Sequence, residues 1–471
     1  MNTTELILGP LVGDLSHDSV KIWGRASGAA ILYAWLFDSG QVKQAGKARV
    51  DRKTGFAGVV EIKDLQPDTW YRYALTLSNE GPPAASFGRF KTAPVPRQLK
   101  NFSFAFGSCF LPLEPDPGLT FQRISRMHGR ASFLLMVGDQ IYADLWKHNG
   151  LKDHIALDKE DYDEVYRYAW SNKHMREVLK NIPVLMTQDD HEVDNDWHWK
   201  DSNRIEAIIP WHIRLRRWLL GRPLVERSLT LERLRVALQT YWEHQGMHGP
   251  ELLIPSTVKN NQVQLEPGKP FSFAYTYTYG GAAFFVMDTR SMRMRGHGKG
   301  EVLGNEQWLK LKSWLRDVND EYPIKFVVTS SAFLHFLLGD YSLDRWSGYP
   351  RERNRLLHYL SEHEIEGVYL LTGDLHSGHA ISVDIKGRSG KNILLWEFCA
   401  SPFEQESNWL AWLLTLRWLP NKLWKNYKVH FVKGKFNYGV VNVNFENPEN
   451  PKVEFELHYL DKKWKVKKIG S

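Results

Sequence analysis

Cysteine is almost absent from this chain, which has two cysteines among 471 residues. So few thiols exclude a disulfide-stapled scaffold and are typical of a protein in a reducing compartment. The longest apolar stretch near the carboxyl end, residues 410–416, is far shorter than the roughly 20 residues that a helix needs to cross a bilayer. The first residues, MNTTELILGP, lack both a basic start and an apolar core of signal-peptide length. We therefore expect a cytoplasmic protein on the sequence given, or an exported one if a leader has been removed.

Positively charged residues are in small excess over negatively charged ones. The 61 Lys and Arg residues exceed the 54 Asp and Glu residues by 7. Over so long a chain, this excess favours anionic partners only mildly, and we expect no stable nucleic-acid partner. A composition of 43% hydrophobic and 24% charged residues excludes a disordered or fibrous chain. Nothing in these features defines an oligomeric state.

The first part of the chain has the pattern of short β-strands. In residues 19–23 and 70–75, apolar and polar side chains alternate or nearly so, as they do on half-buried strands. Breaks such as Gly13-Asp14 and Pro67-Asp68 separate these segments. The pattern predicts a small all-β sandwich of fibronectin or immunoglobulin type over residues 1–93, followed by a stiff linker around Pro94 and Pro96.

From residue 94 to 471 the pattern changes to apolar runs that alternate with stretches of helical spacing. One such stretch, residues 307–318, places Trp308, Leu311 and Leu315 on one helix face. Buried strands that alternate with helices indicate an α/β domain, whose ligands gather at the carboxyl ends of its strands. The runs that we expect to be strands are residues 102–106, 133–137, 183–187, 283–287, 326–329, 368–372 and 393–398.

Four of these expected strands are followed by side chains that ligate metals. The segments are Gly107-Ser108-Cys109, Gly138-Asp139-Gln140-Ile141-Tyr142, Asp189-Asp190-His191-Glu192 with Asp194-Asn195, and Gly373-Asp374-Leu375-His376. Each has an ordinary explanation by itself, because a Gly-Asp pair is a common turn, acidic residues start helices and a buried thiol is usually inert. Their coincidence at four strand ends favours a metal site.

Electrostatics supports a site with more than one cation. Carboxylates brought together without counter-charge repel one another and become protonated, and a pair of cations removes that cost. Thiolate and phenolate favour a trivalent or borderline transition metal, whereas carboxylate and carbonyl oxygens suit Ca²⁺, Mg²⁺ or Mn²⁺. The sequence therefore predicts an asymmetric site, with one half rich in Cys, Tyr and His and the other in oxygen.

As a set, these motifs resemble those of the PhoD-like alkaline phosphatases, a branch of the calcineurin-like metallophosphoesterases. The resemblance extends to Asp288-Thr289-Arg290, Leu303-Gly304-x-x-Gln307-Trp308 and Trp346-x-Gly348-Tyr349, and covers roughly residues 6–440. It implies an α/β fold, namely a four-layer αββα sandwich preceded by the small all-β domain, with a carboxyl-terminal helical or lid segment.

The resemblance also implies a role for each matching residue. Fe³⁺ and Ca²⁺ are the implied cofactors, with Mn²⁺, Mg²⁺ or Zn²⁺ as substitutes. Asp139 would bridge the two metals, with Cys109, Tyr142 and His376 on the iron side and Asp190 and Asp374 on the calcium side. His191 would contact the phosphoryl group, Arg290 would clamp it, and Asn195 would help to bind the substrate.

The implied activity is hydrolysis of phosphate mono- or diesters, because two metal ions neutralise the phosphate oxygens and lower the pKa of a water molecule. Two alternatives stay open: a phosphodiesterase, nuclease or phospholipase D-like activity on the same fold, and a non-catalytic scaffold.

Two further segments have less specific patterns. The Trp-rich segment 409–428 is expected to be core, a lid or a weak membrane-surface contact. The second segment is a cluster of arginines between residues 214 and 235. Such a cluster is more commonly a solvated face, although it could also receive a polyanionic substrate. The cluster consists of Arg214, Arg216, Arg217, Arg222, Arg227, Arg233 and Arg235.

Overall fold

The structure is a computed structural model of the chain. It describes residues 4–38, 41–83, 86–113, 117–127, 129–152, 154–200, 205–206, 215, 218–219, 229–266, 268–296, 300–334, 344–406 and 426–470.

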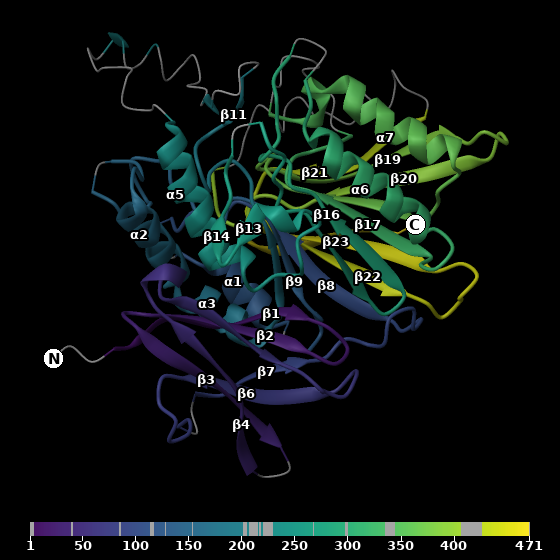
Figure 1. The fold of residues 1–471 in the computed structure, drawn as a ribbon. Coiled ribbons are helices and arrows are strands. Elements are labelled where there is room, and N and C mark those ends of the chain that lie inside the picture. Colours follow the sequence, from purple (N-terminus) through teal and green to yellow (C-terminus); the bar gives the residue numbers. More distant parts are fainter. Residues whose placement is uncertain are drawn as a thin grey trace.

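Two antiparallel sheets form the amino-terminal part of the molecule, drawn in purple and dark blue at the bottom of Figure 1. Val20, Ile22, Leu32, Tyr73 and Phe90, which come from both sheets, are buried in one shared core. One sheet contains β1 (Leu6–Leu15), β2 (Val20–Ala26) and β5 (Ala57–Ile62), and the other β3 (Ala30–Asp38), β4 (Gln41–Val50), β6 (Trp70–Thr76) and β7 (Gly88–Lys91). A domain boundary at residue 93 stays a prediction.

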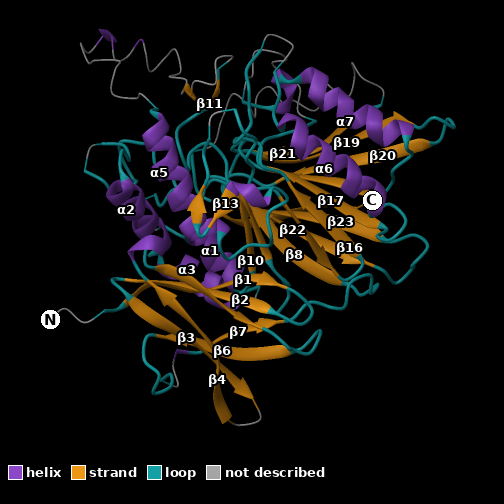
Figure 2. Cartoon of the chain, in the orientation of Figure 1, coloured by secondary structure: helices purple, strands orange, loops and turns teal. Residues whose placement is uncertain are grey.

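Two larger sheets pack face to face in the rest of the chain (Figure 2). The first has the order β10 (Val184–Thr187), β9 (Leu134–Val137), β8 (Phe102–Gly107), β22 (Asn437–Asn444), β23 (Lys452–Asp461) and β24 (Lys463–Gly470). The second has the order β15 (Tyr275–Tyr279), β16 (Ala282–Val286), β17 (Ile324–Thr329), β18 (Val368–Thr372), β20 (Asn392–Cys399), β19 (Gly378–Lys386) and β21 (Tyr427–Lys433).

Aromatic side chains fill the space between the two sheets. The ring centroid of Phe104 on β8 lies 5.5 Å from that of Phe284 on β16 and 5.2 Å from that of Phe326 on β17. This contact buries the inner faces of both sheets, and the outer faces are covered in turn. The central strands are therefore apolar on both sides, which explains why the sequence exposes them as continuous hydrophobic runs.

Helices cover the outer faces of the two sheets (Figure 1). On the first sheet lie α1 (Leu119–Ser125), α2 (Lys159–Trp170), α3 (Lys173–Asn181), α5 (Leu231–Tyr241) and the π-helical turn η4 (Trp242–Gly246). On the second lie α6 (Gly304–Asp317) and α7 (Pro350–Glu362), whose Trp308, Leu311, Leu315, Leu356 and Leu360 pack on β16, β17 and β18. Short pieces complete the described chain: β11 (His198–Trp199), β12 (Ile205–Glu206), β13 (Val258–Lys259), β14 (Gln262–Val263), η1 (Arg52–Thr54), η5 (Pro255–Thr257) and η7 (Trp346–Gly348).

The described carboxyl-terminal residues form strands. Asn437–Asn444 pairs antiparallel with β8, so this late segment lies at the centre of the first sheet beside one of its earliest strands. Lysines 463, 465, 467 and 468 occupy the outermost strand, β24, and such charges protect a sheet edge from pairing with other chains. The expected helical or lid segment falls mostly on residues 407–425, which lie outside the described residues.

Polar contacts join the amino-terminal sheets to the helices that cover the first of the larger sheets. The indole N–H of Trp23 donates to the carbonyl of Glu243 at 2.9 Å, and the Tyr73 hydroxyl donates to the carbonyl of Lys180 at 2.9 Å. Arg25 forms a two-pronged ion pair with Asp163 of α2, with N···O distances of 2.7 and 2.6 Å. These buried or half-buried contacts fix the position of the small sheets against α2, α3 and η4.

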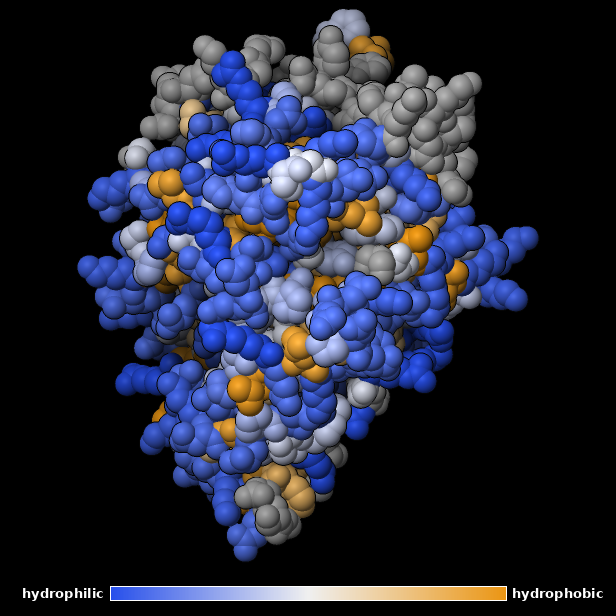
Figure 3. Space-filling model, turned by 90° about the vertical axis from the view of Figure 1, so that its right-hand side faces the viewer, coloured by the Kyte–Doolittle hydropathy of each residue, from blue (hydrophilic) through white to orange (hydrophobic). Residues whose placement is uncertain are grey.

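None of the described helices has the length and apolar composition that spanning a bilayer requires. On the face drawn in Figure 3, hydrophilic residues predominate and hydrophobic residues gather in small, separate patches.

Candidate active site

The predicted metal ligands lie on loops at the carboxyl ends of β8, β9, β10 and β18. The first three strands run parallel to one another, and β18 runs parallel to both of its neighbours. Four of these ligands have left-handed backbone: φ is 63° at Cys109, 55° at Asp139, 63° at Asp374 and 51° at His376. A residue other than glycine pays about 1 kcal/mol or more for that conformation, and such residues cluster at functional sites. The backbone here is shaped to aim side chains at a common centre.

Close packing explains the glycine before Asp139. Gly138 has a φ of +86°, and a Cβ added to it would lie 2.5 Å from the Cβ of Asp189. Only glycine therefore lets the loop after β9 approach the loop after β10 so closely.

The sulfur-containing side of the site joins Cys109, Asp139, Tyr142 and His376. The Cys109 Sγ lies 3.3 Å from Asp139 Oδ2, and the Tyr142 hydroxyl lies 3.3 Å from His376 Nε2. Burial, assisted by the charge of Asp374, raises the pKa of the Cys109 thiol to about 12. Burial lowers the pKa of His376 to about 3, so this imidazole is neutral and has a lone pair for a metal.

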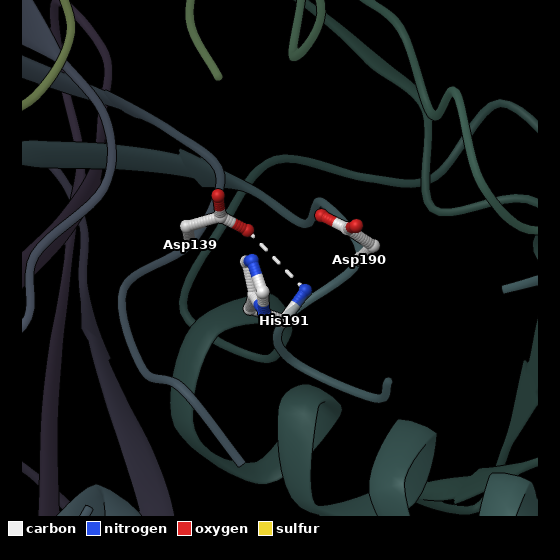
Figure 4. Close-up of side chains that lie close together, drawn as sticks. All are labelled: Asp139, Asp190 and His191. Carbon is white, nitrogen blue, oxygen red and sulfur yellow. Dashed lines mark hydrogen bonds between the residues drawn. The ribbon is translucent and has the colours of Figure 1, made fainter. Parts of the chain in front are cut away.

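The oxygen-rich side is built from carboxylates (Figure 4). Ligand atoms of Asp139, Asp190 and His191 lie within 4.8 Å of one another, and so do those of Asp139, Asp189 and Asp374. Asp139 belongs to both groups and thus occupies the junction between them. Burial is the main cause that raises the pKa of Asp139 and of Asp374 well above the usual range, and neighbouring anions add to it.

These residues fit the cations that the sequence implies. Oδ2 of Asp189, Oδ1 of Asp190 and Oδ2 of Asp374 are buried and have no hydrogen-bond partner among the described residues. Buried carboxylate oxygens are normally hydrogen-bonded or coordinate a metal, because an uncompensated buried charge is costly. A thiol, a phenol and a neutral imidazole on one side and carboxylates on the other form a donor set for one transition metal and one harder cation.

His191 is held by Asp144, a residue that the sequence analysis did not single out. Nδ1 of His191 lies 2.7 Å from Oδ1 of Asp144, and the imidazole packs on the ring of Tyr142 with centroids 4.3 Å apart. Burial by itself lowers the pKa of His191, but the carboxylates of Asp144, Asp190 and Asp139 outweigh it and raise the pKa well above its ordinary value. Asp144 thereby orients the imidazole and stabilises its protonated form.

Arg290 lies next to the predicted metal ligands but faces inward. Its guanidinium is fully buried and contacts the carboxylate of Asp189, Asp344 Oδ1 at 2.6 Å and Asp190 Oδ1 at 3.4 Å. It acts here as the internal counter-charge of three carboxylates, and its predicted contact with the substrate stays a prediction.

Asn195 lies at the same edge, where its side-chain amide donates to Asp196 at 2.9 Å and its backbone N–H donates to Asp144 at 3.3 Å. Its predicted substrate contact is likewise untested. Asp196 itself was not predicted, although its ligand oxygen lies within 4.8 Å of those of Asp190 and Asp344.

Glu192 is another residue whose role the sequence did not reveal. Its buried carboxylate accepts backbone N–H groups of Asp139 at 3.1 Å, Gln140 at 2.7 Å and Asp189 at 2.8 Å. The side chain of Gln245 donates to it at 3.1 Å. Glu192 stands within the Asp-Asp-His-Glu motif, so its position was visible, but its partners in other loops were not.

The arginine cluster is only partly described. Arg233 is buried, with Nη1 2.5 Å from Asp194 Oδ2 and Nε 2.8 Å from the Ala156 carbonyl, so it is a structural residue. Arg235 is exposed and lies 3.8 Å from Glu232. Residues 214, 216, 217, 222 and 227 lie outside the described residues, as do residues 409–425 of the Trp-rich segment.

Comparison with known proteins identifies the family to which this sequence is similar. A sequence model of the PhoD-like phosphatase family matches residues 104–447. The chain is 22% identical over 431 residues to alkaline phosphatase D of Bacillus subtilis (strain 168). The aligned region covers 82% of this chain and 67% of that protein.

Two solved structures share the fold. The structure of PhoD matches with a TM-score of 0.71 and 19% identity, covering 99% of this chain and 90% of the other. Purple acid phosphatase PPD1 from yellow lupin (Lupinus luteus) seeds matches with a TM-score of 0.59 and 14% identity. That match covers 98% of this chain and 73% of the lupin protein. The α/β fold expected from the sequence is confirmed.

Proposed function

The chain belongs to the PhoD-like phosphatase family and is a metal-dependent hydrolase of phosphoric esters, and we propose that it cleaves phosphate mono- and diesters at a site for two unlike cations. The proposal rests on one observation above all: Asp139 belongs to two of the three groups of closely spaced ligand atoms found among the described residues.

We assign the cations by donor chemistry. Cys109, Tyr142 and His376 would hold Fe³⁺, Asp190 and Asp374 would hold Ca²⁺, and Asp139 would contact both. Bound there, the cations supply neutralisation of the phosphate oxygens and a lowered pKa for a water molecule. Mn²⁺, Mg²⁺ or Zn²⁺ are the substitutes that the same donors accept.

We propose that His191 donates a proton or a hydrogen bond to the reacting phosphoryl group. Because Nδ1 is held by Asp144, Nε2 is the nitrogen available to the phosphoryl group. A protonated imidazole donates a hydrogen bond to an equatorial oxygen, or a proton to the departing alkoxide. The burial of His191 between Tyr142 and Asp144 fixes the direction of that hydrogen bond.

Arg290 and Asn195 support this arrangement in different ways. Arg290 balances Asp189, Asp190 and Asp344, which keeps the Asp190 carboxylate in place beside Asp139. We propose that Asn195, anchored through Asp144 and Asp196, borders the space into which the ester enters. A non-catalytic scaffold has no use for so many buried carboxylates, which destabilise a fold without cations.

Hydrolysis of chromogenic esters tests the proposal. A phosphate monoester and a phosphate diester of 4-nitrophenol are each incubated with the purified protein, with and without chelator, and then with iron and calcium restored. We expect turnover of both esters that chelation abolishes and the two metals restore. Turnover of neither ester by metal-loaded protein, or turnover that resists complete metal removal, would contradict the proposal.

A further inference from the structure

Two buried arginines beside the carboxylate cluster are paired with its carboxylates. Arg290 is buried against Asp189 and Asp344. Arg293 is also buried, where it donates to the Thr289 carbonyl at 2.8 Å, to the Asp344 carbonyl at 2.9 Å and to Asp344 Oδ1 at 3.2 Å. Both guanidinium groups are thus paired with Asp344, although Arg290 Nη1 and Arg293 Nη2 are buried without a hydrogen-bond partner among the described residues.

Arg345 is different. Within the part of the chain that the structure describes, its guanidinium forms neither a hydrogen bond nor an ion pair, and its Nε is buried without a partner. Arg345 directly follows Asp344, whose Oδ1 lies 2.6 Å from Arg290 Nη2 and which shares a group of closely spaced ligand atoms with Asp190 and Asp196. The positive charge of Arg345 also acts to lower the pKa of Asp344, Asp374 and His376. A half-buried cation with no ion-pair partner among the described residues therefore lies next to this cluster of carboxylates.

The backbone around Arg345 is firmly held. The Arg345 carbonyl accepts the N–H of Gly348 at 2.9 Å, and the next residue, Trp346, is buried. The Trp346 indole donates to Thr329 Oγ1 at 2.8 Å and packs on Phe333 with ring centroids 5.0 Å apart. The backbone position of Arg345 is therefore set by packing, while its guanidinium has no hydrogen bond or ion pair with any of the residues that the structure describes.

A desolvated guanidinium is stabilised by an anion that can accept several of its parallel N–H groups, and a phosphoryl group is such an anion. We propose that Arg345 binds the non-bridging oxygens of the substrate phosphate and makes the site favour monoesters over diesters. The proposal rests on the proposed function. A monoester is mostly dianionic above its second pKa near 6, whereas a diester carries one charge and fewer free oxygens, so a monoester gains more from this contact.

Substitution of Arg345 tests this role. R345M removes the charge and keeps an apolar stem, and R345K keeps the charge without the planar fork. Arg351, an exposed arginine in the first turn of α7, provides the matched control R351M. For each variant we would measure kcat and KM with the two 4-nitrophenyl esters, metal content, and the affinity for inorganic phosphate by calorimetry.

For R345M we expect the KM for the monoester and the Kd for phosphate to rise about 10- to 100-fold, as the loss of a charged hydrogen bond predicts. The KM for the diester should rise much less, metal content should stay unchanged, R345K should be intermediate and R351M should match the wild type. Equal effects on both esters, loss of metal from R345M, or an unchanged affinity for phosphate would overturn the proposal. Phosphate binding needs no turnover, so a wild-type protein that cleaves neither ester would refute the proposed function while calorimetry still decides the role of Arg345.

Discussion

The carboxylate of Glu192 accepts the backbone N–H of Asp139 at 3.1 Å, although 53 positions separate the two residues in the chain. The same carboxylate accepts the backbone N–H of Gln140, the next residue in the loop after β9. It also accepts the backbone N–H of Asp189, which lies in the loop after β10 together with Glu192. The loops after β9 and β10 are thus fixed to each other by one buried anion, and both carry predicted metal ligands.

Replacing Glu192 should therefore weaken the fold and the site together. In E192Q, an amide NH₂ would face backbone N–H donors, and we expect the free energy of unfolding to fall by about 2–4 kcal/mol. Urea denaturation and metal analysis measure both effects, with E177Q on the exposed face of α3 as the control. Equal stability and metal content in the two variants would show that Glu192 does not hold the loops.

The pair formed by Asp144 and His191 should matter for turnover and not for metal retention. D144N keeps an acceptor near Nδ1 but removes the charge that stabilises the protonated imidazole. We expect kcat to fall roughly 100-fold or more, as for loss of an oriented general acid. Metal content should equal that of the wild type, and an unchanged kcat would rule out this role for Asp144.

The two cysteines allow a matched test of the thiolate ligand. In iron-loaded protein, C109S should bleach or shift the visible absorption that thiolate donation to iron produces. C399S should leave the band unchanged, because Sγ of Cys399 lies 3.4 Å from the Ser377 carbonyl and 3.7 Å from that of Gly373. A spectrum that changes in C399S and persists in C109S would place the iron elsewhere.

The ion pair between Arg25 and Asp163 should make the stability depend on pH. Burial acts to raise the pKa of Asp163, but Arg25 and Lys159 outweigh it and lower the pKa to about 2. An acid with a lowered pKa in the folded state stabilises the fold above its unfolded pKa near 4 and loses that contribution as the pH falls toward 2. At pH 6 we expect D163N to be less stable than the wild type by about 2 kcal/mol.

Urea denaturation across that pH range checks the sign. The difference between wild type and D163N should shrink as the pH falls from about 4 to 2, and the exposed-residue control D320N should match the wild type throughout. A difference that stays constant with pH would mean that Asp163 acts through packing alone.

Much of the catalytic sheet could be predicted because its strands are buried on both faces. The apolar run 368–372 coincides with β18, and the polar residues after it lie where the strand ends. The pairing of β22 with β8 was missed, since Ser103 and Asn442 meet across 339 positions and no local pattern encodes that distance.

The site was predictable only where its residues follow strands. Asp344 lies on a loop away from strand ends, so nothing in the local sequence distinguishes it from a surface carboxylate. Asp196 directly follows the Asp194-Asn195 pair, but its contacts with Asp190 and Asp344 depend on the fold. Arg290 does follow β16, but its burial depends on Asp189 and Asp344, which are 101 and 54 positions away. Burial against distant partners is a property of the folded chain, and the sequence pattern does not contain it.

The shared position of Asp139 can be tested most directly by metal analysis. Wild-type protein and D139N are reconstituted with iron and calcium, and bound metal is measured by mass spectrometry alongside monoester turnover. We expect D139N to retain little of either metal and to show no measurable turnover. A D139N protein with a full complement of metal and a near-normal rate would contradict the account.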